Sequence, residues 1–133
     1  MRSLSDIHAE LMQINDFVLR GVPDNDIALM MTTGSTLVTY LASTAAMVAE
    51  AGKYYSQAKT RAYHTLAISS SANDKYYSPS LAKDYVASRC SDEGYIYEFA
   101  QRMNAAVTHS LDMIRTCISA EKQLLSNLQM GSH

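Results

Sequence analysis

The sequence lacks the short motifs that mark the common catalytic and phosphate-binding sites. Its 133 residues contain only 5 glycines, all isolated, so no GxGxxG loop, P-loop or GxSxG elbow is present. The chain also has no HExxH and no other pairing of histidine with a second ligand at a recognisable metal-binding spacing. We therefore expect no catalytic residues, no metal site and no cofactor, and we predict that the protein is not an enzyme.

Cysteine is scarce as well. The only two, Cys90 and Cys117, lie far apart and form neither a CxxC pair nor a cluster with histidine. This argues against a disulfide framework or a zinc site and favours two reduced thiols in a cytoplasmic protein. Carboxylates stand singly apart from two pairs, which both fall at predicted helix starts. Capping and the helix dipole account for those pairs, so a two-carboxylate active site has little support.

A strong excess of positive charge is absent. The formal net charge is -2, from 11 basic and 13 acidic residues, which argues against a protein that coats DNA. Nine of the basic residues lie from Lys53 onward, so an anionic ligand should meet the later segments. The first residues lack the charged and apolar regions of a signal peptide, and Gly131–His133 resembles the start of an expression tag. Residues 1–130 are therefore expected to form one domain.

Apolar residues at helical spacing predict a first helix over residues 4–20. Its apolar stripe consists of Leu4, Ile7, Leu11, Ile14 and Val18. Ser3 is placed to cap this helix, with Asp6 as its capping partner, and Gly21–Pro23 should end it.

A second and much longer helix is predicted over residues 24–68, beginning at Asp24. From Ile27 to Ala49 it carries no charged residue at all. The stretch is long enough for a membrane span, but its many Thr and Ser residues and the lack of closely flanking basic residues argue against one. We interpret it as a helix buried on nearly all sides. Because one chain of this size cannot surround such a helix, we expect a homo-oligomer in which other subunits do so.

The rest of the chain is predicted to turn back. Residues 69–80 are typical of a loop, followed by a short helix over 81–90 and a long helix over 94–128. Steps of three or four residues along the last helix mark an apolar seam: Ile96, Phe99, Met103, Ala106, Ser110, Ile114, Cys117, Glu121, Leu125 and Leu128. The predicted fold is all-α. Two long antiparallel helices, with a short N-terminal helix and a short connecting helix, would form an oligomeric helical bundle.

All nine tyrosines lie between Tyr40 and Tyr97, among most of the basic residues. Aromatic faces stack on nucleobases and nearby cations neutralise phosphates, so this combination indicates a nucleotide-like ligand. The competing interpretation is that tyrosine fills helix interfaces and subunit contacts. The candidate ligand-binding residues are Tyr55, Lys59, Arg61, Tyr63, Tyr76, Tyr77, Arg89 and Tyr95. His64 and His109 could also meet across the long helices, although ordinary, partly buried histidines are the simpler interpretation.

The stretch from Ala49 to Tyr63, AEAGKYYSQAKTRAY, has the pattern AEAxxxYxxAKxxAY, and YVASRC follows at Tyr85–Cys90. With the long closing helix, these segments resemble small helical-hairpin proteins of bacteriophages, over residues 37–128. That group includes many proteins of unknown activity, some of them encoded near recombination and replication genes. Phages also carry compact oligomers that sequester nucleotide signals of host immunity. The resemblance implies a phage protein that works in the cytoplasm of an infected bacterium.

These observations lead to a first hypothesis and two alternatives. We expect a non-enzymatic, homo-oligomeric binding protein that sequesters a small anionic nucleotide signal and so counters host defence. The first alternative is an accessory factor that binds single-stranded nucleic acid in phage recombination or replication, with an affinity that falls steeply with salt. The second is a purely protein-interaction module. The expected partners are the chain itself and a nucleotide, with no membrane; nucleic acid is less favoured because of the net charge.

Overall fold

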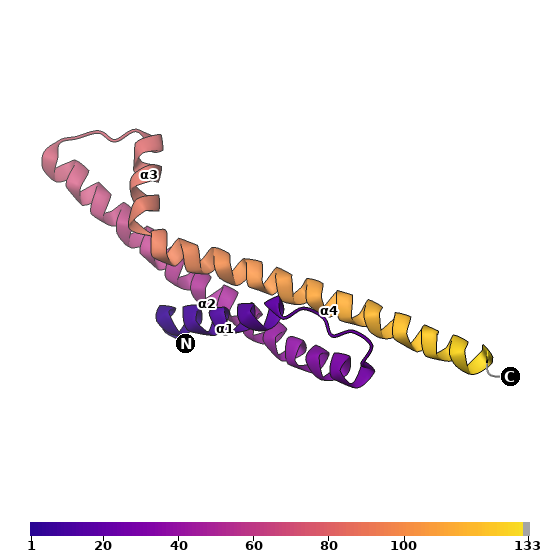
Figure 1. Ribbon diagram of the computed structural model, residues 1–133. Helices are drawn as coiled ribbons and strands as arrows, with labels where there is room; N and C mark the ends of the chain where they lie inside the picture. The colour runs from indigo at the N-terminus through magenta and orange to yellow at the C-terminus, as the bar shows by residue number, and fades with distance from the viewer. Residues whose placement is uncertain (132–133) are drawn as a thin grey trace.

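The computed structural model describes residues 1–131, and these residues confirm the all-α class. They contain four helices and no strand: α1 (Leu4–Leu19), α2 (Ile27–Asn73), α3 (Pro79–Arg89) and α4 (Ser91–Gly131). Figure 1 shows two long helices, α2 and α4, lying side by side, with α1 against them and α3 at the end where the chain turns back. Ser132 and His133, which belong to the predicted tag remnant, lie outside the described residues. Within the described range, none of the helices combines the length and apolar character that crossing a membrane requires.

The helix starts follow the capping chemistry of the sequence, with one correction. Ser3 caps α1 as predicted, because its Oγ accepts a hydrogen bond from the backbone N–H of Asp6 at 3.1 Å. The cap of α2 is Asp26 and not Asp24: the Asp26 carboxylate accepts from the N–H of Leu29 at 3.0 Å. Asn25, with φ 58°, takes the left-handed conformation that asparagine tolerates, and the helix therefore begins only after it.

The loop predicted over residues 69–80 is shorter in the structure. Helix α2 continues to Asn73, whose side-chain amide donates to the backbone carbonyl of Ser69 at 2.9 Å. Asp74 then ends the helix in the left-handed conformation, with φ 50°. Pro79 opens α3 with a rigid φ, so the connection is reduced to residues 74–78. The polar composition of this segment therefore reflects an exposed helix end rather than a long loop.

Contacts between α2 and α4 define how the two long helices are paired. A Cβ added at Gly34 would lie 3.5 Å from Cγ2 of Ile114, and the side-chain amide of Asn104 donates to Oγ1 of Thr44 at 3.0 Å. Residue numbers rise along α2 while those of their partners fall along α4, so the two helices run in opposite directions (Figure 1). The hydroxyl of Thr44 also donates to the carbonyl of Leu41, which satisfies this fully buried polar side chain.

This pairing rules out a meeting of His64 and His109 across the long helices, the less favoured of the two interpretations of these histidines. His64 lies on the part of α2 that packs against α3, whereas His109 lies beyond Asn104 towards the other end of α4. Both histidines are exposed. The distance along the helices therefore separates them, and neither is the partly buried histidine that the simpler interpretation expected.

Helix α1 completes the core by docking against both long helices. The middle of its predicted apolar stripe is buried: Ile7, Leu11 and Ile14 are 0–1 % exposed. They join a single cluster with buried residues of α2 and α4, including Met47 and Val107. Full burial of such side chains stabilises the fold by roughly 1.5–3 kcal/mol each, so α1 is an integral part of the domain.

An ion-pair network fastens the N-terminus to the bundle. Nε of Arg2 lies 2.7 Å from Glu10 on α1, and Nη1 lies 3.0 Å from Glu50 on α2. The hydroxyl of Tyr54 donates to the Arg2 carbonyl at 2.7 Å. Desolvation lowers the pKa of Arg2, but its hydrogen bond to Glu50 and the charges of Glu10 and Glu50 outweigh this and raise it above its ordinary value. Because these side chains are partly exposed, the network contributes modestly and chiefly fixes orientation.

The seam of α4 differs in part from the prediction. Its buried residues are Ile96, Ala100, Met103, Val107, Leu111 and Ile114. The predicted members Phe99, Ala106 and Ser110 are only half-buried. Helix α4 contacts both α2 and α1. The predicted seam follows a single line of residues along α4 and so does not separate the positions that face α2 from those that face α1.

The uncharged stretch of α2 is not buried on nearly all sides in the single chain. One face of it is exposed at steps of three and four residues, and we call this face the α2 stripe: Ala28, Met31, Ser35, Val38, Ala42, Ala45 and Ala49. The chain as a whole exposes 8740 Å², whereas a monomer of 14.7 kDa typically exposes about 6,900 Å². The elongated bundle therefore leaves much more surface in water than a compact monomer of its size.

Candidate anion-binding site

A polar cavity lies where α2, α3 and the start of α4 meet. Its volume is about 340 Å³, and its lining comes from all three helices: Ala58, Arg61, Ala62, Thr65, Tyr85, Arg89 and Glu93. The two alanines form a floor that continues into a small buried cluster with Val86 and Cys90. Two of the predicted ligand residues, Arg61 and Arg89, are thus brought together from different helices.

The side chains of α3 hold Arg89 against an aromatic ring. Nε of Arg89 donates to the hydroxyl of Tyr85 at 3.1 Å, and its Cζ lies 5.4 Å from the centre of the same ring. The two residues are four apart on one helix, a spacing that places side chains on the same face. The remaining guanidinium donors of Arg89 stay available for a ligand, since guanidinium carries five N–H groups.

The charges around the cavity favour an anion. Among the described residues, Arg61 and Arg89 form no ion pair with a carboxylate, whereas Arg2, Arg102 and Arg115 do. Glu93 also lines the cavity, so the formal charge of the lining is +1. Two arginines can each bind a phosphate or carboxylate oxygen pair in bidentate fashion, which a lysine cannot.

Two further predicted residues, Tyr55 and Lys59, lie beside the cavity but do not line it. Nζ of Lys59 lies 4.4 Å from the centre of the Tyr55 ring, a cation–π contact. That ring packs on Gly94, where an added Cβ would lie 3.1 Å from Cε2 of Tyr55, and 5.8 Å from the ring of Tyr97. The ring of Tyr55 therefore packs α2 against α4 and is not part of the cavity lining. Lys59 adds a positive charge next to the cavity.

The other predicted tyrosines are scattered. Tyr63 is 49 % exposed, on α2 outside the cavity lining. Tyr76 is 87 % exposed and Tyr77 is half-buried, both in the connection between α2 and α3. No residue of this group lines the cavity, so the structure does not bring them together with the two arginines.

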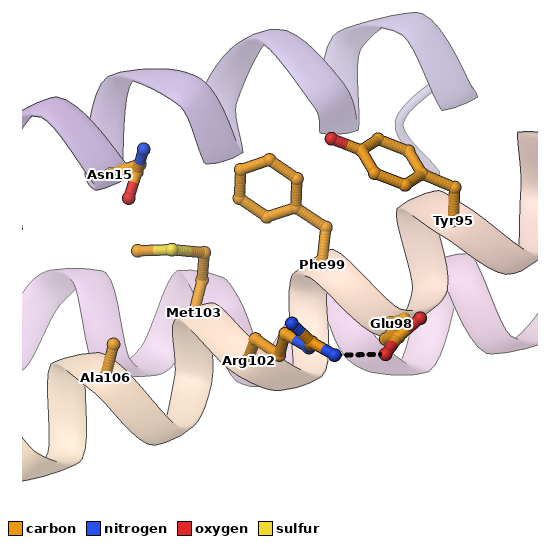
Figure 2. Close-up of a pocket in the computed structure, with 7 residues that line it drawn as sticks. All are labelled: Asn15, Tyr95, Glu98, Phe99, Arg102, Met103 and Ala106. Atoms are coloured by element: carbon orange, nitrogen blue, oxygen red, sulfur yellow. Dashed lines mark hydrogen bonds and ion pairs between the residues drawn. The ribbon is translucent and has the colours of Figure 1, made fainter.

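Tyr95 belongs to a different cavity, between α1 and α4. Figure 2 shows its ring beside Phe99, with Asn15 of α1 on the facing side. This cavity, of about 380 Å³, is mainly apolar, and its only cation, Arg102, is paired with Glu98 at 2.6 Å (Figure 2). The ring of Tyr95 also contacts His8 of α1. A neutralised apolar cavity offers little to an anion, so the candidate site is the one lined by the two arginines.

Besides the two alanines, three lining residues of the candidate site are absent from the sequence prediction: Thr65, Tyr85 and Glu93. Tyr85 carries a usable signal, because it precedes Arg89 by four residues on a predicted helix. Thr65 and Glu93 carry none, since their place in the site depends on how α2 packs against α4. The described residues contain no group of three or more His, Cys, Asp or Glu side chains that could hold a metal ion.

Cys90, under the floor of the cavity, is expected to be a slow thiol. It is 1 % exposed; burial and then the charge of Glu93 raise its pKa, against smaller opposing effects of Arg61 and Lys59. The thiolate is the reactive form, so a raised pKa lowers reactivity at pH 8. We expect Ellman's reagent to label half-buried Cys117 at least about tenfold faster than Cys90. Equal rates in the native protein, with both thiols reactive in denaturant, would contradict this placement of Cys90.

Comparison of the chain with protein-family models, with curated proteins and with solved structures found no match. The phage origin, the role against host defence and the cytoplasmic location therefore stay predictions from the resemblance of residues 37–128.

Proposed function

We propose that the protein is a non-enzymatic binding protein that holds a small phosphorylated ligand, of nucleotide size, between α2, α3 and α4. The single observation that carries the proposal is the convergence of Arg61 and Arg89 on one cavity, without carboxylate partners among the described residues. Tyr85 would present its ring at the edge of the same cavity, where a base could stack. Arginine pairs with an adjacent aromatic ring suit the phosphate and the base of one nucleotide.

The size of the cavity supports a small ligand. Its volume of about 340 Å³ lies at the lower end of the range of small-molecule sites, about 300–1,000 Å³. A mononucleotide fits this range, and a polymer would need a groove that continues along the surface. The net charge of -2 also weakens non-specific attraction to nucleic acid.

We further propose that the protein works as a homo-oligomer that assembles through the α2 stripe. The stripe repeats every seven residues, which suits packing against a second helix. Its alanines allow helix backbones to approach closely, and an uncharged surface avoids repulsion between copies. The exposed area also supports assembly, because it exceeds that of a typical monomer by more than the roughly 800 Å² that each partner buries in a standard interface.

The test of the proposed ligand is a binding measurement with AMP, adenosine and inorganic phosphate as probes. We expect AMP to bind more tightly than either part, and Arg61→Ala to weaken AMP binding about tenfold by isothermal titration calorimetry, because a charge-assisted contact is lost. Arg115→Ala is the matched control: Arg115 is an exposed arginine on α4, paired with Asp112 and remote from the cavity. Wild-type protein that binds none of the three probes, or equal losses in both variants, would refute the proposal.

A further inference from the structure

The residues of α4 that face α2 follow a seven-residue repeat. On α4 this repeat continues beyond the level at which α2 begins. From Asn104 onward, α4 places seam residues at alternating steps of three and four: Asn104, Val107, Leu111, Ile114, Ile118, Glu121, Leu125 and Leu128. This is the spacing of a coiled-coil seam. The positions Val107, Leu111 and Ile114 are buried, whereas Leu125 and Leu128 are 45 % and 63 % exposed.

The change from buried to exposed coincides with the start of α2. Gly34 faces Ile114, so Ile27, seven residues earlier on α2, lies level with Glu121, seven residues later on α4. Because α2 begins at Ile27, it does not reach beyond this level, and α4 projects past the rest of the bundle, as Figure 1 shows. Every residue from 122 to 131 is exposed, Leu124 among them at 52 %. We call residues 122–131 the α4 tail.

The tail thus carries the same apolar face that α2 covers elsewhere, but no helix among residues 1–131 covers it there. Exposed leucines on a helix that projects into solvent are costly to leave in water and typical of an interaction surface. The partner that fits best is another helix with the same repeat, running opposite to α4 as α2 does. The tail of a second copy meets each of these conditions.

Charge and symmetry agree with this partner. The tail has one charged residue, Lys122, and the adjoining turn has Glu121, so two tails carry little like charge against each other. A two-fold axis across the tails makes the contact self-complementary, with Leu125 of one copy opposite Leu128 of the other. The partner tail then lies in line with α2 and continues its cover of the seam.

We propose that two copies of the chain dimerise by antiparallel pairing of their α4 tails, through Leu124, Leu125 and Leu128. This contact is separate from the α2 stripe and does not depend on the proposed ligand. Because the tails project away from the cavity end, the two cavities of such a dimer lie at its far ends, outside the contact between the copies.

Sedimentation equilibrium of the full chain tests the contact. We expect Leu125→Glu/Leu128→Glu to raise the apparent dissociation constant of the assembly at least about tenfold, while far-UV circular dichroism stays unchanged because both residues are exposed. The matched control is Ser119→Glu/Ser126→Glu, which adds the same charge at two exposed positions on the opposite face of α4, one in the tail and one just before it, and is expected to leave the mass unchanged. Assembly that is equal in both variants, or a wild-type chain that is monomeric at all concentrations, would overturn the proposal.

A disulfide test fixes the direction of the pairing. In a Cys117→Ser background, chains with Leu125→Cys are mixed with chains with Leu128→Cys and oxidised. Antiparallel tails predict that the mixed disulfide forms faster than the disulfide of Leu125→Cys chains alone. The reverse order would show parallel tails and contradict the proposal. AMP affinity, measured on the same proteins, is expected to stay at the wild-type value. The dimer proposal and the ligand proposal are therefore tested by separate measurements, and one can fail without the other.

Discussion

Val107→Asp is expected to lower the free energy of unfolding by about 4 kcal/mol or more, the largest effect of any single change described for this chain. Val107 is fully buried in the centre of the contact between α2 and α4. A carboxylate at this position would lose its hydration among the apolar side chains of the core cluster, none of which can pair with a charge. Urea denaturation followed by circular dichroism measures the change.

Ala105→Asp is the control for this prediction. Ala105 lies two residues away on α4 and is exposed, so its replacement should change the free energy of unfolding by less than about 0.5 kcal/mol. The pair therefore tests the rotational register of α4. Equal destabilisation by both variants would show that the helix is turned differently from the structure described above.

Leu11→Ala is expected to cost about 2–5 kcal/mol, because it removes a fully buried side chain and leaves a cavity between α1 and both long helices. Leu11 lies at the middle of the buried face of α1, between Ile7 and Ile14. Its loss therefore weakens the attachment of the whole helix, and not only one contact. The change in the urea midpoint at constant slope reports this loss of stability.

The matched control is Met12→Ala on the same helix. Met12 is 43 % exposed, so its truncation should leave the midpoint nearly unchanged. If Leu11→Ala were as mild as Met12→Ala, α1 would not belong to the cooperative core that α2 and α4 form.

Helix positions were largely accessible from the sequence because they depend on local chemistry. The apolar stripe of α1 and the cap at Ser3 were predicted correctly, since both depend on residues a few positions apart. The sequence prediction ends α2 too early: it places the Ser-rich segment before Asp74 in a loop, although Ser and Asn side chains also support an exposed helix end.

The seam of α4 shows why local periodicity is not sufficient. A path through Ala106 and Ser110 and a path through Val107 and Leu111 both satisfy helical spacing. Only the packing of two different neighbours, α2 on one side and α1 on the other, decides which path is buried. That information lies in contacts between residues far apart in the chain, which no local pattern contains.

The candidate site, too, could be predicted from the sequence only in part. Cationic residues and tyrosines after Lys53 were a compositional signal, and Arg61 and Arg89 do meet at one cavity. Their convergence depends on the turn between α2 and α3, so composition could suggest it, but only the fold could establish it. Two of the tyrosines have a packing role: Tyr55 and Tyr97 fill the close approach of two helices at Gly94 and Gly52, which is the interpretation that competes with a ligand-binding role.

Because α2 and α4 run in opposite directions, their contacts enclose loops of different lengths. This difference bears on the order in which the contacts form during folding. Contacts near α3, such as Tyr55 with Gly94, close a loop of about forty residues, and each later contact, through Thr44 with Asn104 to Gly34 with Ile114, encloses a longer segment. The shortest loop costs the least entropy to close, and once it is closed each next contact along the two helices orders only a few more residues. We therefore expect the helices to pair first near α3, so that the cavity with Arg61 and Arg89 would belong to the part of the chain that forms early.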